Sequence, residues 1–569
     1  MLELGSSGSA RGVSSNGHPY RDPRWTTDVT VRNSRRCPQG GGSGGSAVRP
    51  RSPYRPQPRI KVKEKRRPYI HTLGTELIVM TEAAVLYREI DALLAIVRRE
   101  GAAQAEAWAD YVGPADFQES ASNLAHYLAF RHRDLRALQR PLMRLGLSSL
   151  GRLESRVVPA LMAVKAALAA LTGLAPKNGP STETFFGGER RLVERTHELL
   201  GSSASSRAVA LMVTCPTEAA EEPSFMQALA ERGVEAVRIN CAHDDADHWQ
   251  QMIDYVRAAE KATGRRLKIL MDLAGPKIRT GKVRLAAGHE RIGKAAILAI
   301  VPPGGLDRIE LDDQHFAVEC TLPEALRAIK VGDRLFVDDG KLGAEVERVE
   351  AWGVLARVTS VVAKGIRLKP EKGLNFPDTE LKITALTDKD WADLDYIAAH
   401  ADGIEFSFVQ SAADVKMLQN ALSERRPNDW RSLSLILKIE TALAVRNLPD
   451  LLVHAAWQQP TGIMIARGDL AVAIGFARMA EMQEEILWIG EAAHVPVIWA
   501  TQVLEHLIKK GIPSRGEMTD AAMAARAECV MLNKGPYLFE AIDALDQLLE
   551  RMDVHQHKKT PQLRRLKSW

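Results

Sequence analysis

The sequence predicts an α/β protein built on a (β/α)8 TIM barrel, with a small β domain inserted into the barrel and an all-α domain before it. Three observations support this prediction. The length of 569 residues predicts three or four folding units. Eight short apolar runs alternate with helical stretches after residue 205, as in a parallel barrel. The segment 282–376 interrupts this alternation with a β-type pattern of its own.

The eight apolar runs have the character of buried parallel strands. They are nearly continuous in apolar and β-branched residues, and a candidate helix follows most of them. Together, segments 205–281 and 377–555 have close to the ~250 residues typical of this barrel. The runs are Val209–Thr214, Ala236–Asn240, Ile269–Asp272, Ile404–Val409, Leu435–Glu440, Ile463–Arg467, Val495–Thr501 and Cys529–Asn533.

The inserted segment 282–376 predicts a β domain. Apolar and other residues alternate in 334-RLFV-337 and 355-LARV-358, and glycines at 332, 340, 343 and 353 mark turns. The segment contains no convincing long helix. We therefore expect a small β domain inserted after the third barrel strand.

Residues 75–200 predict an all-α domain. Leucines recur at helical spacing in one stripe, a second stripe follows, and 146-GLSS-149 separates them as a helix stop and a new cap. Four arginines (Arg131, Arg133, Arg136 and Arg140) lie along the first stripe. A solvated basic helix face is the favoured interpretation, and a DNA-reading helix-turn-helix is the alternative. The stripes are Leu124, Leu128, Leu135, Leu138, Leu142, Leu145 and Val157, Leu161, Val164, Leu168, Leu171.

Residues 1–74 predict a disordered basic tail. They are rich in Gly, Ser, Pro and Arg, and this composition cannot bury enough apolar surface to fold. Their charge is +11, so the remaining chain carries −6 of the total of +5. The basic excess therefore says little about the main activity. We expect a solvated tail, or a stretch preceding a true start at Met80, rather than a basic arm for nucleic acid.

Composition excludes several classes of protein. Hydrophobic residues make up 45% and no run of ~18 apolar residues is present, so we expect no membrane partner. The five cysteines are scattered and form no CxxC pair, which argues against disulfides and zinc. Residues 1–20 lack the apolar core of a signal peptide. We therefore expect a cytoplasmic protein without a specific nucleic-acid partner.

Polar residues follow the predicted barrel strands where an active site is expected. Glu440 and Asp469 end neighbouring strands, and two carboxylates are enough to hold Mg²⁺, which fills its octahedron with water and substrate oxygens. Three cations, Arg238, Arg279 and Lys438, would favour a transferring phosphoryl group. Thr501 places a hydroxyl at the next strand end. Singly, each of these residues is as well explained by a rim charge or a helix cap.

Ten segments resemble the pyruvate kinase family in order and spacing. The resemblance spans residues 205–550, and its GPKIRTG and ARGDL motifs are highly specific. It implies a barrel whose inserted β domain is a mobile lid. The segments are 235-EAVRINCAH-243, 270-LMDLAGPKIRTG-281, 332-GDRLFVDDG-340, 372-KGLNFPD-378, 382-KITALTDKD-390, 406-FSFVQ-410, 437-LKIE-440, 463-IMIARGDLAV-472, 498-IWATQ-502 and 513-PSRGE-517.

The resemblance implies transfer of a phosphoryl group from phosphoenolpyruvate to ADP, giving pyruvate and ATP. Glu440 and Asp469 would bind Mg²⁺ or Mn²⁺, and Lys438 would stabilise the phosphoryl group. The implied roles of the remaining residues are phosphate binding by Arg238 and Arg279, carboxylate binding by the amides of Gly468 and Asp469, enolate protonation through Thr501, nucleotide and cation contacts by Asn240 and His243, and lid closure with Asp339.

One departure from the family concerns the monovalent cation. Many members bind K⁺ with hydroxyl side chains together with Asn and Asp oxygens, here Asn240 and Asp272, but the two hydroxyl positions are Ala242 and Leu273. Lys277 stands where K⁺-dependent members carry Glu. We therefore expect that an ammonium group replaces the ion and that K⁺ is not required.

Other departures concern catalytic contacts and chain ends. The turn after strand eight is 533-NKGPY-537 instead of the family's Ser-Gly-Glu-Thr-like turn, the arginine of the FVR motif is Gln410, and an expected asparagine is Met523. The chain ends at Trp569, so we expect the family's C-terminal regulatory domain to be missing. Residues 556–569 predict a solvated basic tail. We expect a homo-oligomer, and residues 75–200 are the candidate segment for its assembly.

Two other functions stay open at this point. A metal-dependent aldolase or lyase that forms pyruvate enolate also uses a Glu and an Asp on neighbouring strands, but it has no need of Asp339, Arg238 or His243. A catalytically inactive relative used for binding or regulation is the second alternative. Retention of several buried charges argues against it, because unpaired buried charges cost stability.

Overall fold

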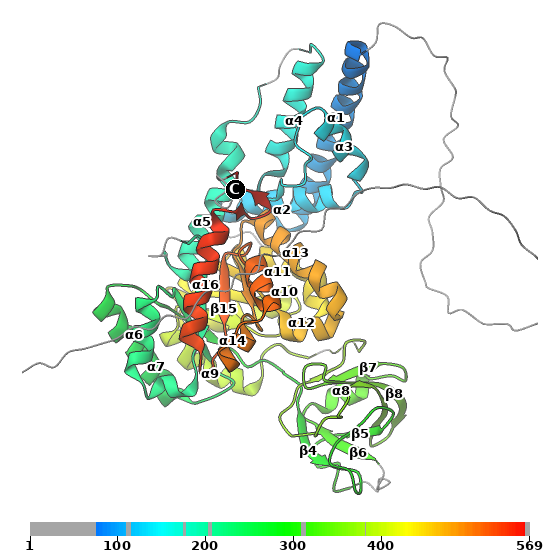
Figure 1. The fold of residues 1–569 in the computed structure, drawn as a ribbon, viewed down its shortest axis with the longest axis vertical. Helices are drawn as coiled ribbons and strands as arrows, with labels where there is room; N and C mark the ends of the chain where they lie inside the picture. The colour runs from blue at the N-terminus through cyan, green and yellow to red at the C-terminus, as the bar shows by residue number, and fades with distance from the viewer. Residues whose placement is uncertain are drawn as a thin grey trace, which may run out of the picture. The chain divides into compact units, whose positions relative to one another are not determined.

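Eight parallel strands close into a barrel in the computed structural model (Figure 1). Their order around the barrel is β1-β15-β14-β13-β12-β11-β3-β2. Each predicted apolar run forms one of these strands, which confirms the predicted fold class. The strands are β1 (Ala210–Thr214), β2 (Ala236–Asn240), β3 (Lys268–Asp272), β11 (Gly403–Phe406), β12 (Ser434–Ile439), β13 (Thr461–Ala466), β14 (Val497–Ala500) and β15 (Cys529–Leu532).

The structure describes residues 75–109, 115–174, 178–202, 207–308, 315–379, 381 and 383–563. The prediction of a disordered tail over residues 1–74 lies outside these ranges, as do residues 564–569 of the predicted C-terminal tail. Within the described part, the helices of the barrel are α6 (Pro223–Glu231), α7 (Ala246–Thr263), α9 (Asp388–His400), α10 (Ala412–Arg425), α11 (Ala442–Ala456), α12 (Arg467–Ile474), α13 (Phe476–Ala493), α14 (Glu505–Lys510), α15 (Arg515–Ala524) and α16 (Leu538–Asp553).

The inserted segment forms a separate seven-stranded sheet with the order β10-β7-β8-β9-β5-β6-β4 (Figure 1). It has its own hydrophobic core, and the one helix among its described residues has only six residues. The expectation of a β domain without a long helix is therefore confirmed. Its elements are β4 (Thr280–Arg284), β5 (Ile297–Val301), β6 (Phe316–Cys320), α8 (Pro323–Ala328), β7 (Arg334–Val337), β8 (Leu342–Glu350), β9 (Gly353–Val361) and β10 (Leu374–Asn375).

Five helices precede the barrel. The first leucine stripe runs across α2 and α3, and the second runs along α4, whose last leucine, Leu171, is 44% exposed. One continuous hydrophobic core joins these helices to the outer layer of the barrel. The Trp108 indole donates to Asp450 on α11 at 2.8 Å. The helices are α1 (Thr75–Ala107), α2 (Gln118–Arg131), α3 (Arg136–Arg144), α4 (Val157–Leu171) and α5 (Thr182–Leu200).

The end of α5 enters the barrel. Leu199 and Leu200 belong to the same buried cluster as the inward-facing side chains of the strands, such as Met212 and Met464. A Cβ atom at Gly462, near the start of β13, would lie 2.6 Å from Leu199 Cδ2, so a larger residue there would require Leu199 to shift. The helical segment therefore closes the amino end of the barrel and shares its core.

The C-terminal segment differs from the solvated tail that we expected. Residues 556–561 form a hairpin of β16 (Gln556–His557) and β17 (Thr560–Pro561). Between these strands, Lys558 forms an ion pair with Glu528 and Lys559 forms one with Glu154. Glu528 and Glu154 are both buried, and a buried carboxylate is costly without a cationic partner. The prediction of a solvated tail was wrong for these residues because composition does not show what a lysine contacts.

In the described ranges, every helix is too short or too polar to cross a membrane. Cys215, Cys241, Cys320 and Cys529 are free and buried.

Candidate active site

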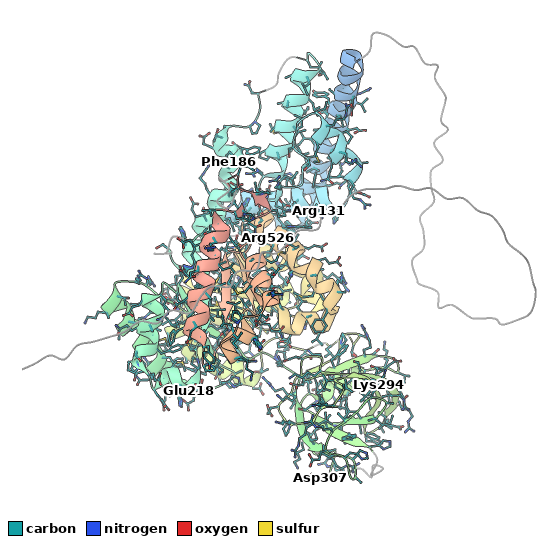
Figure 2. The ribbon with its side chains drawn as sticks, viewed as in Figure 1. Arg131, Phe186, Glu218, Lys294, Asp307 and Arg526 are labelled. Atoms are coloured by element: carbon teal, nitrogen blue, oxygen red, sulfur yellow. The ribbon has the colours of Figure 1, made fainter. Side chains whose placement is uncertain are left out.

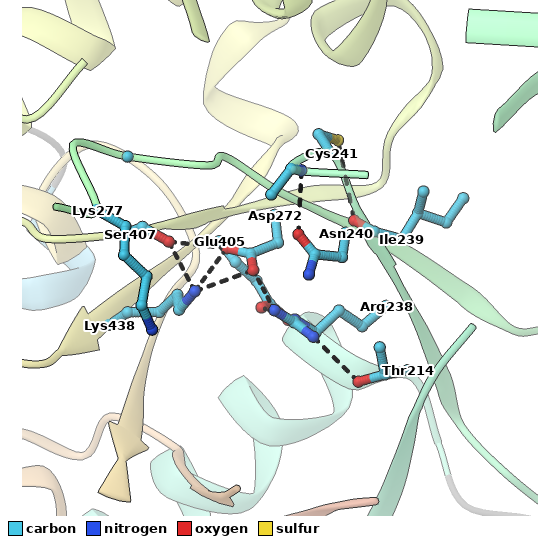
Figure 3. A network of polar contacts seen from close by, with 12 residues as sticks. Thr214, Arg238, Ile239, Asn240, Cys241, Asp272, Lys277, Glu405, Ser407 and Lys438 are labelled. Carbon is cyan, nitrogen blue, oxygen red and sulfur yellow. Dashed lines mark hydrogen bonds and ion pairs between the residues drawn. The ribbon is translucent and has the colours of Figure 1, made fainter. Parts of the chain in front are cut away.

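Buried charged side chains gather at the carboxyl ends of four barrel strands (Figure 3). Arg238 comes from β2, Asp272 from β3, Glu405 from β11 and Lys438 from β12. Each side chain is less than 12% exposed. Because parallel strands bring their carboxyl ends to one edge, residues far apart in sequence meet here.

Asp272 is the centre of this network. Its two carboxylate oxygens accept hydrogen bonds from Lys438 Nζ at 2.8 and 2.9 Å, and Oδ1 accepts a third from Ser407 Oγ at 3.1 Å. Arg238 also donates to it. Burial alone would raise the pKa of Asp272, but the charges of Arg238 and Lys438 outweigh burial and lower the pKa. Asp272 is therefore a fixed anion that holds two cations.

Lys438 is oriented by three groups. Besides Asp272, its Nζ donates to Ser407 Oγ at 2.6 Å and lies 3.7 Å from Glu440 Oε1. Burial disfavours the ammonium form, but the charges of Asp272 and Glu440 outweigh burial and raise the pKa of Lys438. Lys438 therefore stays charged in a desolvated position, where its field is strongest.

Arg238 is held by Glu405, which the sequence analysis did not single out. The Nε of Arg238 donates to Glu405 Oε2 at 2.8 Å, and its Nη1 donates to Thr214 Oγ1 at 3.1 Å. The other oxygen of Glu405 is buried without a hydrogen-bond partner. Burial raises the pKa of Glu405 to about 7, although Arg238 acts in the opposite direction. A lone glutamate between Ile404 and Phe406 was the signal available in the sequence.

Glu440 and Asp469 lie close enough to interact. Burial, followed by the charge of Asp469, raises the pKa of Glu440 to about 7, with Lys438 acting against both. The amide of Phe408, a residue with the positive φ of 55°, donates to Glu440 Oε2 at 2.6 Å. Asp469 Oδ2 accepts from Lys277 Nζ at 3.0 Å. The structure therefore brings the two predicted carboxylates together, with Lys277 on one of them.

This carboxylate pair fits Mg²⁺. Among the described residues no cluster of three or more His, Cys, Asp or Glu side chains is placed to hold a metal. Two carboxylates nevertheless suit Mg²⁺, which commonly takes one or two from the protein and the rest of its ligands from water and substrate. One oxygen each of Glu440 and Asp469 accepts no hydrogen bond from the described residues and is left for this role.

Thr501 lies in a strained turn beside the start of α12. Thr501 and Gln502 have φ values of 62° and 57°, which are uncommon for residues other than glycine. The amide of Gly468 donates to Thr501 Oγ1 at 3.0 Å, and Arg467 donates to Thr501 O at 2.6 Å. Strain of this kind persists only where surrounding contacts impose it. Two of the predicted site residues, Gly468 and Thr501, are thus in direct contact.

The other predicted residues lie around this cluster. Arg279 Nη1 donates to Glu371 O at 3.2 Å, and Asn240 Oδ1 accepts from the amide of Ala242 at 3.1 Å. Burial and the charge of Lys534 lower the pKa of His243. Asp339 has a φ of 54° and lies in a turn of the inserted domain. Gly373 lies close to this turn, since a Cβ atom built on it would be 3.9 Å from Asp339 Oδ1.

Lys277 has a carboxylate partner that the sequence did not predict. Its hydrogen bond is to Asp469 on α12. Figure 3 draws Lys277 together with the residues of the Asp272 network. Lys277 therefore adds a positive charge to the carboxylate pair itself.

Comparison with known proteins identifies the family of this site. Residues 207–542, more than half of the chain, match the model of the pyruvate kinase barrel domain. The chain belongs to the pyruvate kinase family. The matched segment carries the whole charged network of the pyruvate kinase barrel and excludes helices α1–α5.

Curated relatives agree with this assignment. Pyruvate kinase of Methylorubrum extorquens is 31% identical over 343 residues, which cover 59% of this chain and 66% of the relative. Pyruvate kinase of Dictyostelium discoideum is 31% identical over 57% of this chain and 62% of the relative. Pyruvate kinase of Corynebacterium glutamicum is 33% identical over 54% and 60%. The chain thus spans less than two thirds of the length of these relatives.

Proposed function

We propose that this protein is a pyruvate kinase that transfers a phosphoryl group from phosphoenolpyruvate to ADP, giving pyruvate and ATP. The main support is the buried ammonium of Lys438, held by Asp272 and Ser407 at 3.7 Å from Glu440. A fixed cation beside two metal-binding carboxylates stabilises the charge of a phosphoryl group in transfer. This arrangement favours phosphoryl transfer over a purely structural role.

In the proposed reaction, the bond between phosphorus and the enol oxygen breaks while a β-phosphate oxygen of ADP bonds to phosphorus. Glu440 and Asp469 would hold Mg²⁺ or Mn²⁺, which would neutralise phosphate charge. Lys438 would face the oxygens of the transferring group, and Arg238 and Arg279 would bind phosphate. The resulting enolate takes a proton at carbon, with Thr501 in the relay, to give pyruvate.

The remaining assignments complete the proposal. The amides of Gly468 and Asp469 would bind the carboxylate of the substrate, and the Gly468 amide, which here donates to Thr501 Oγ1, would exchange that acceptor for the carboxylate. Asn240 and His243 would face the nucleotide and the cation. Asp339 would close over the site, which excludes water and strengthens the charges inside.

We also propose that K⁺ is not required. The support is the hydrogen bond of Lys277 to Asp469, which places a permanent positive charge beside the site. Purified protein assayed at saturating Mg²⁺ should turn over equally in K⁺ and in a tetramethylammonium salt. A strict K⁺ requirement would refute this proposal.

The activity itself is tested by coupling pyruvate formation to NADH oxidation through added lactate dehydrogenase. Wild-type protein should show turnover that depends on Mg²⁺, phosphoenolpyruvate and ADP together. Lys438→Ala should lower kcat by about 100-fold or more, because transition-state charge is lost. Lys416→Ala on the exposed side of α10 is the matched control and should leave kcat unchanged.

Two outcomes would favour the alternatives. A folded wild-type protein without turnover would favour a binding or regulatory relative. Aldol addition of pyruvate to an aldehyde, without any nucleotide, would favour the enolate-forming aldolase. A cytoplasmic location and a homo-oligomeric state are also proposals, and light scattering of the full chain tests the oligomeric state.

A further inference from the structure

A cavity of about 470 Å³ lies where the helical segment, α13 and the C-terminal hairpin meet. Its wall includes Tyr127 and Arg131 of α2, Arg136 of α3, Trp488 of α13 and Lys559 of the hairpin. These segments lie at the amino end of the barrel, because α13 runs back from the carboxyl end to the start of β14. The cavity is therefore separate from the candidate active site.

Cations outnumber carboxylates in this wall. Arg131, Arg133, Arg136 and Lys559 face it, with Asp134 and Glu154 as the only acidic residues among its lining residues. Each of these two carboxylates already has a lining cation as a partner. Asp134 lies 2.6 Å from Arg136, and Glu154 pairs with Lys559. The acidic groups of the cavity are thus neutralised by two of its four cations.

The other two cations are Arg131 and Arg133. Arg133 has a carboxylate partner outside the cavity, Glu100, at 2.6 Å. Arg131, labelled in Figure 2, donates to the neutral Tyr127 hydroxyl at 2.8 Å and has no ion pair with any described residue within 4 Å. Its guanidinium therefore keeps donors free for an anion.

Trp488 brings two of the positive groups together. The Arg131 guanidinium lies 4.6 Å from its ring centroid, and Lys559 Nζ lies 4.5 Å from it. Two like charges that contact one ring repel each other, and a bound anion would reduce this repulsion. The contacts with the ring hold both cations at the cavity wall in the absence of a ligand.

We propose that this cavity binds a small anion that carries at least one phosphate group. Its volume suits a metabolite, and arginine forks match the oxygen geometry of phosphate. The site favours a small molecule over duplex DNA, because its charges line a pocket and Arg140, the fourth arginine of the basic stripe, does not line it. A bound anion would join three segments and stabilise the folded chain by mass action.

The test is calorimetric titration of the full chain with inorganic pyrophosphate at low ionic strength. Wild-type protein should show a saturable site, and the melting temperature should rise with pyrophosphate. Arg131→Gln should weaken this site about tenfold, the usual effect of losing hydrogen bonds to a charged group. Arg140→Gln removes the same charge from the same helical region outside the cavity and should leave affinity unchanged.

Two further variants keep the test decisive. Arg136 is 86% exposed in its side chain, so Arg136→Gln should fold normally and weaken binding about threefold. Arg279→Gln changes the candidate active site and should leave this binding intact.

Several results would overturn the proposal. These are the absence of saturable binding, equal weakening by Arg140→Gln, or loss of binding in Arg279→Gln with full binding in Arg131→Gln. Binding of duplex DNA that competes with pyrophosphate and is lost in Arg140→Gln would also overturn it, in favour of the DNA-reading alternative.

Discussion

The two ends of the barrel differ in the kind of side chain that they bury. At the carboxyl end, Arg238, Asp272 and Lys438 form a buried charged network. At the amino end, Leu199 and Leu200 of α5 fill the interior with apolar side chains. Buried ion pairs contribute little or nothing to stability compared with well-packed apolar groups. We therefore expect the charged residues of the carboxyl end to serve catalysis and the apolar residues of the amino end to stabilise the fold.

The largest expected effect separates these roles at the carboxyl end. Glu440→Gln should lower kcat by about 100- to 1000-fold, because a metal ligand and a site charge are lost. The free energy of unfolding at pH 8 should fall little, because the substitution removes a carboxylate that is costly to bury in its charged form. Coupled assays and urea unfolding measure both quantities.

Glu424→Gln, on the exposed side of α10, is the control for Glu440→Gln and should change neither quantity. If Glu440→Gln unfolded the protein while Glu424→Gln did not, the carboxyl end would have a structural role that this comparison denies.

The next effect tests the amino end. Leu200→Ala should lower the free energy of unfolding by about 3 kcal/mol, because it leaves a cavity in a fully buried position. The kcat of the folded fraction should stay at the wild-type value. Leu171→Ala, at a position 44% exposed, should cost less than about 1 kcal/mol. Equal costs for the two variants would contradict the closing role of α5.

A third effect concerns pH at the carboxyl end. The pKa of Glu405 is about 7 in the folded chain and 4.5 ordinarily, so the folded state keeps a proton that the unfolded state loses. This group therefore lowers stability as pH rises from 5 to 8. Glu405→Gln removes this contribution. The free energy of unfolding of the variant, relative to wild type, should therefore rise by about 2 kcal/mol between pH 5 and pH 8. Urea unfolding of both proteins at pH 5 and pH 8 measures the stability difference between them. A stability difference that is the same at both pH values would contradict this prediction.

The smallest effect concerns a polar contact between the helical segment and the barrel. Ser120 Oγ accepts from Arg195 at 2.9 Å and lies 2.9 Å from His494 Nδ1, and His494 is buried. Ser120→Ala should lower the free energy of unfolding by about 1 kcal/mol, the usual net value of a buried hydrogen bond. The kcat should not change. A kcat loss comparable to that of Glu440→Gln would show that the two ends are coupled.

The sequence was sufficient for the barrel strands and for much of the candidate site. Continuous apolar runs predict buried parallel strands, and the ends of such strands converge, so Arg238, Asp272, Lys438 and Glu440 were expected together. Glu405 was missed because a glutamate within an apolar run does not reveal that it faces an arginine from another strand.

Tertiary contacts explain the other differences. The pattern of α5 shows an apolar side but not that Leu199 and Leu200 enter the barrel. Composition suggested a solvated C-terminal tail, whereas Lys558 and Lys559 contact carboxylates from distant segments. The hydrogen bond of Lys277 to Asp469 was not predicted either, because the sequence does not show which carboxylate the ammonium meets. Each difference depends on a partner far away in the chain.

The ion pair between Lys559 and Glu154 links residues 405 positions apart. A ribosome adds about 5 to 20 residues per second, so on the order of 20 to 80 seconds separate the synthesis of these two side chains. The barrel likewise cannot close before β15, its last strand in the sequence, has been synthesised. Until then, the leucines of the early helices lack the barrel surface that buries them in the folded chain, and exposed apolar surface of this kind is prone to aggregation during synthesis.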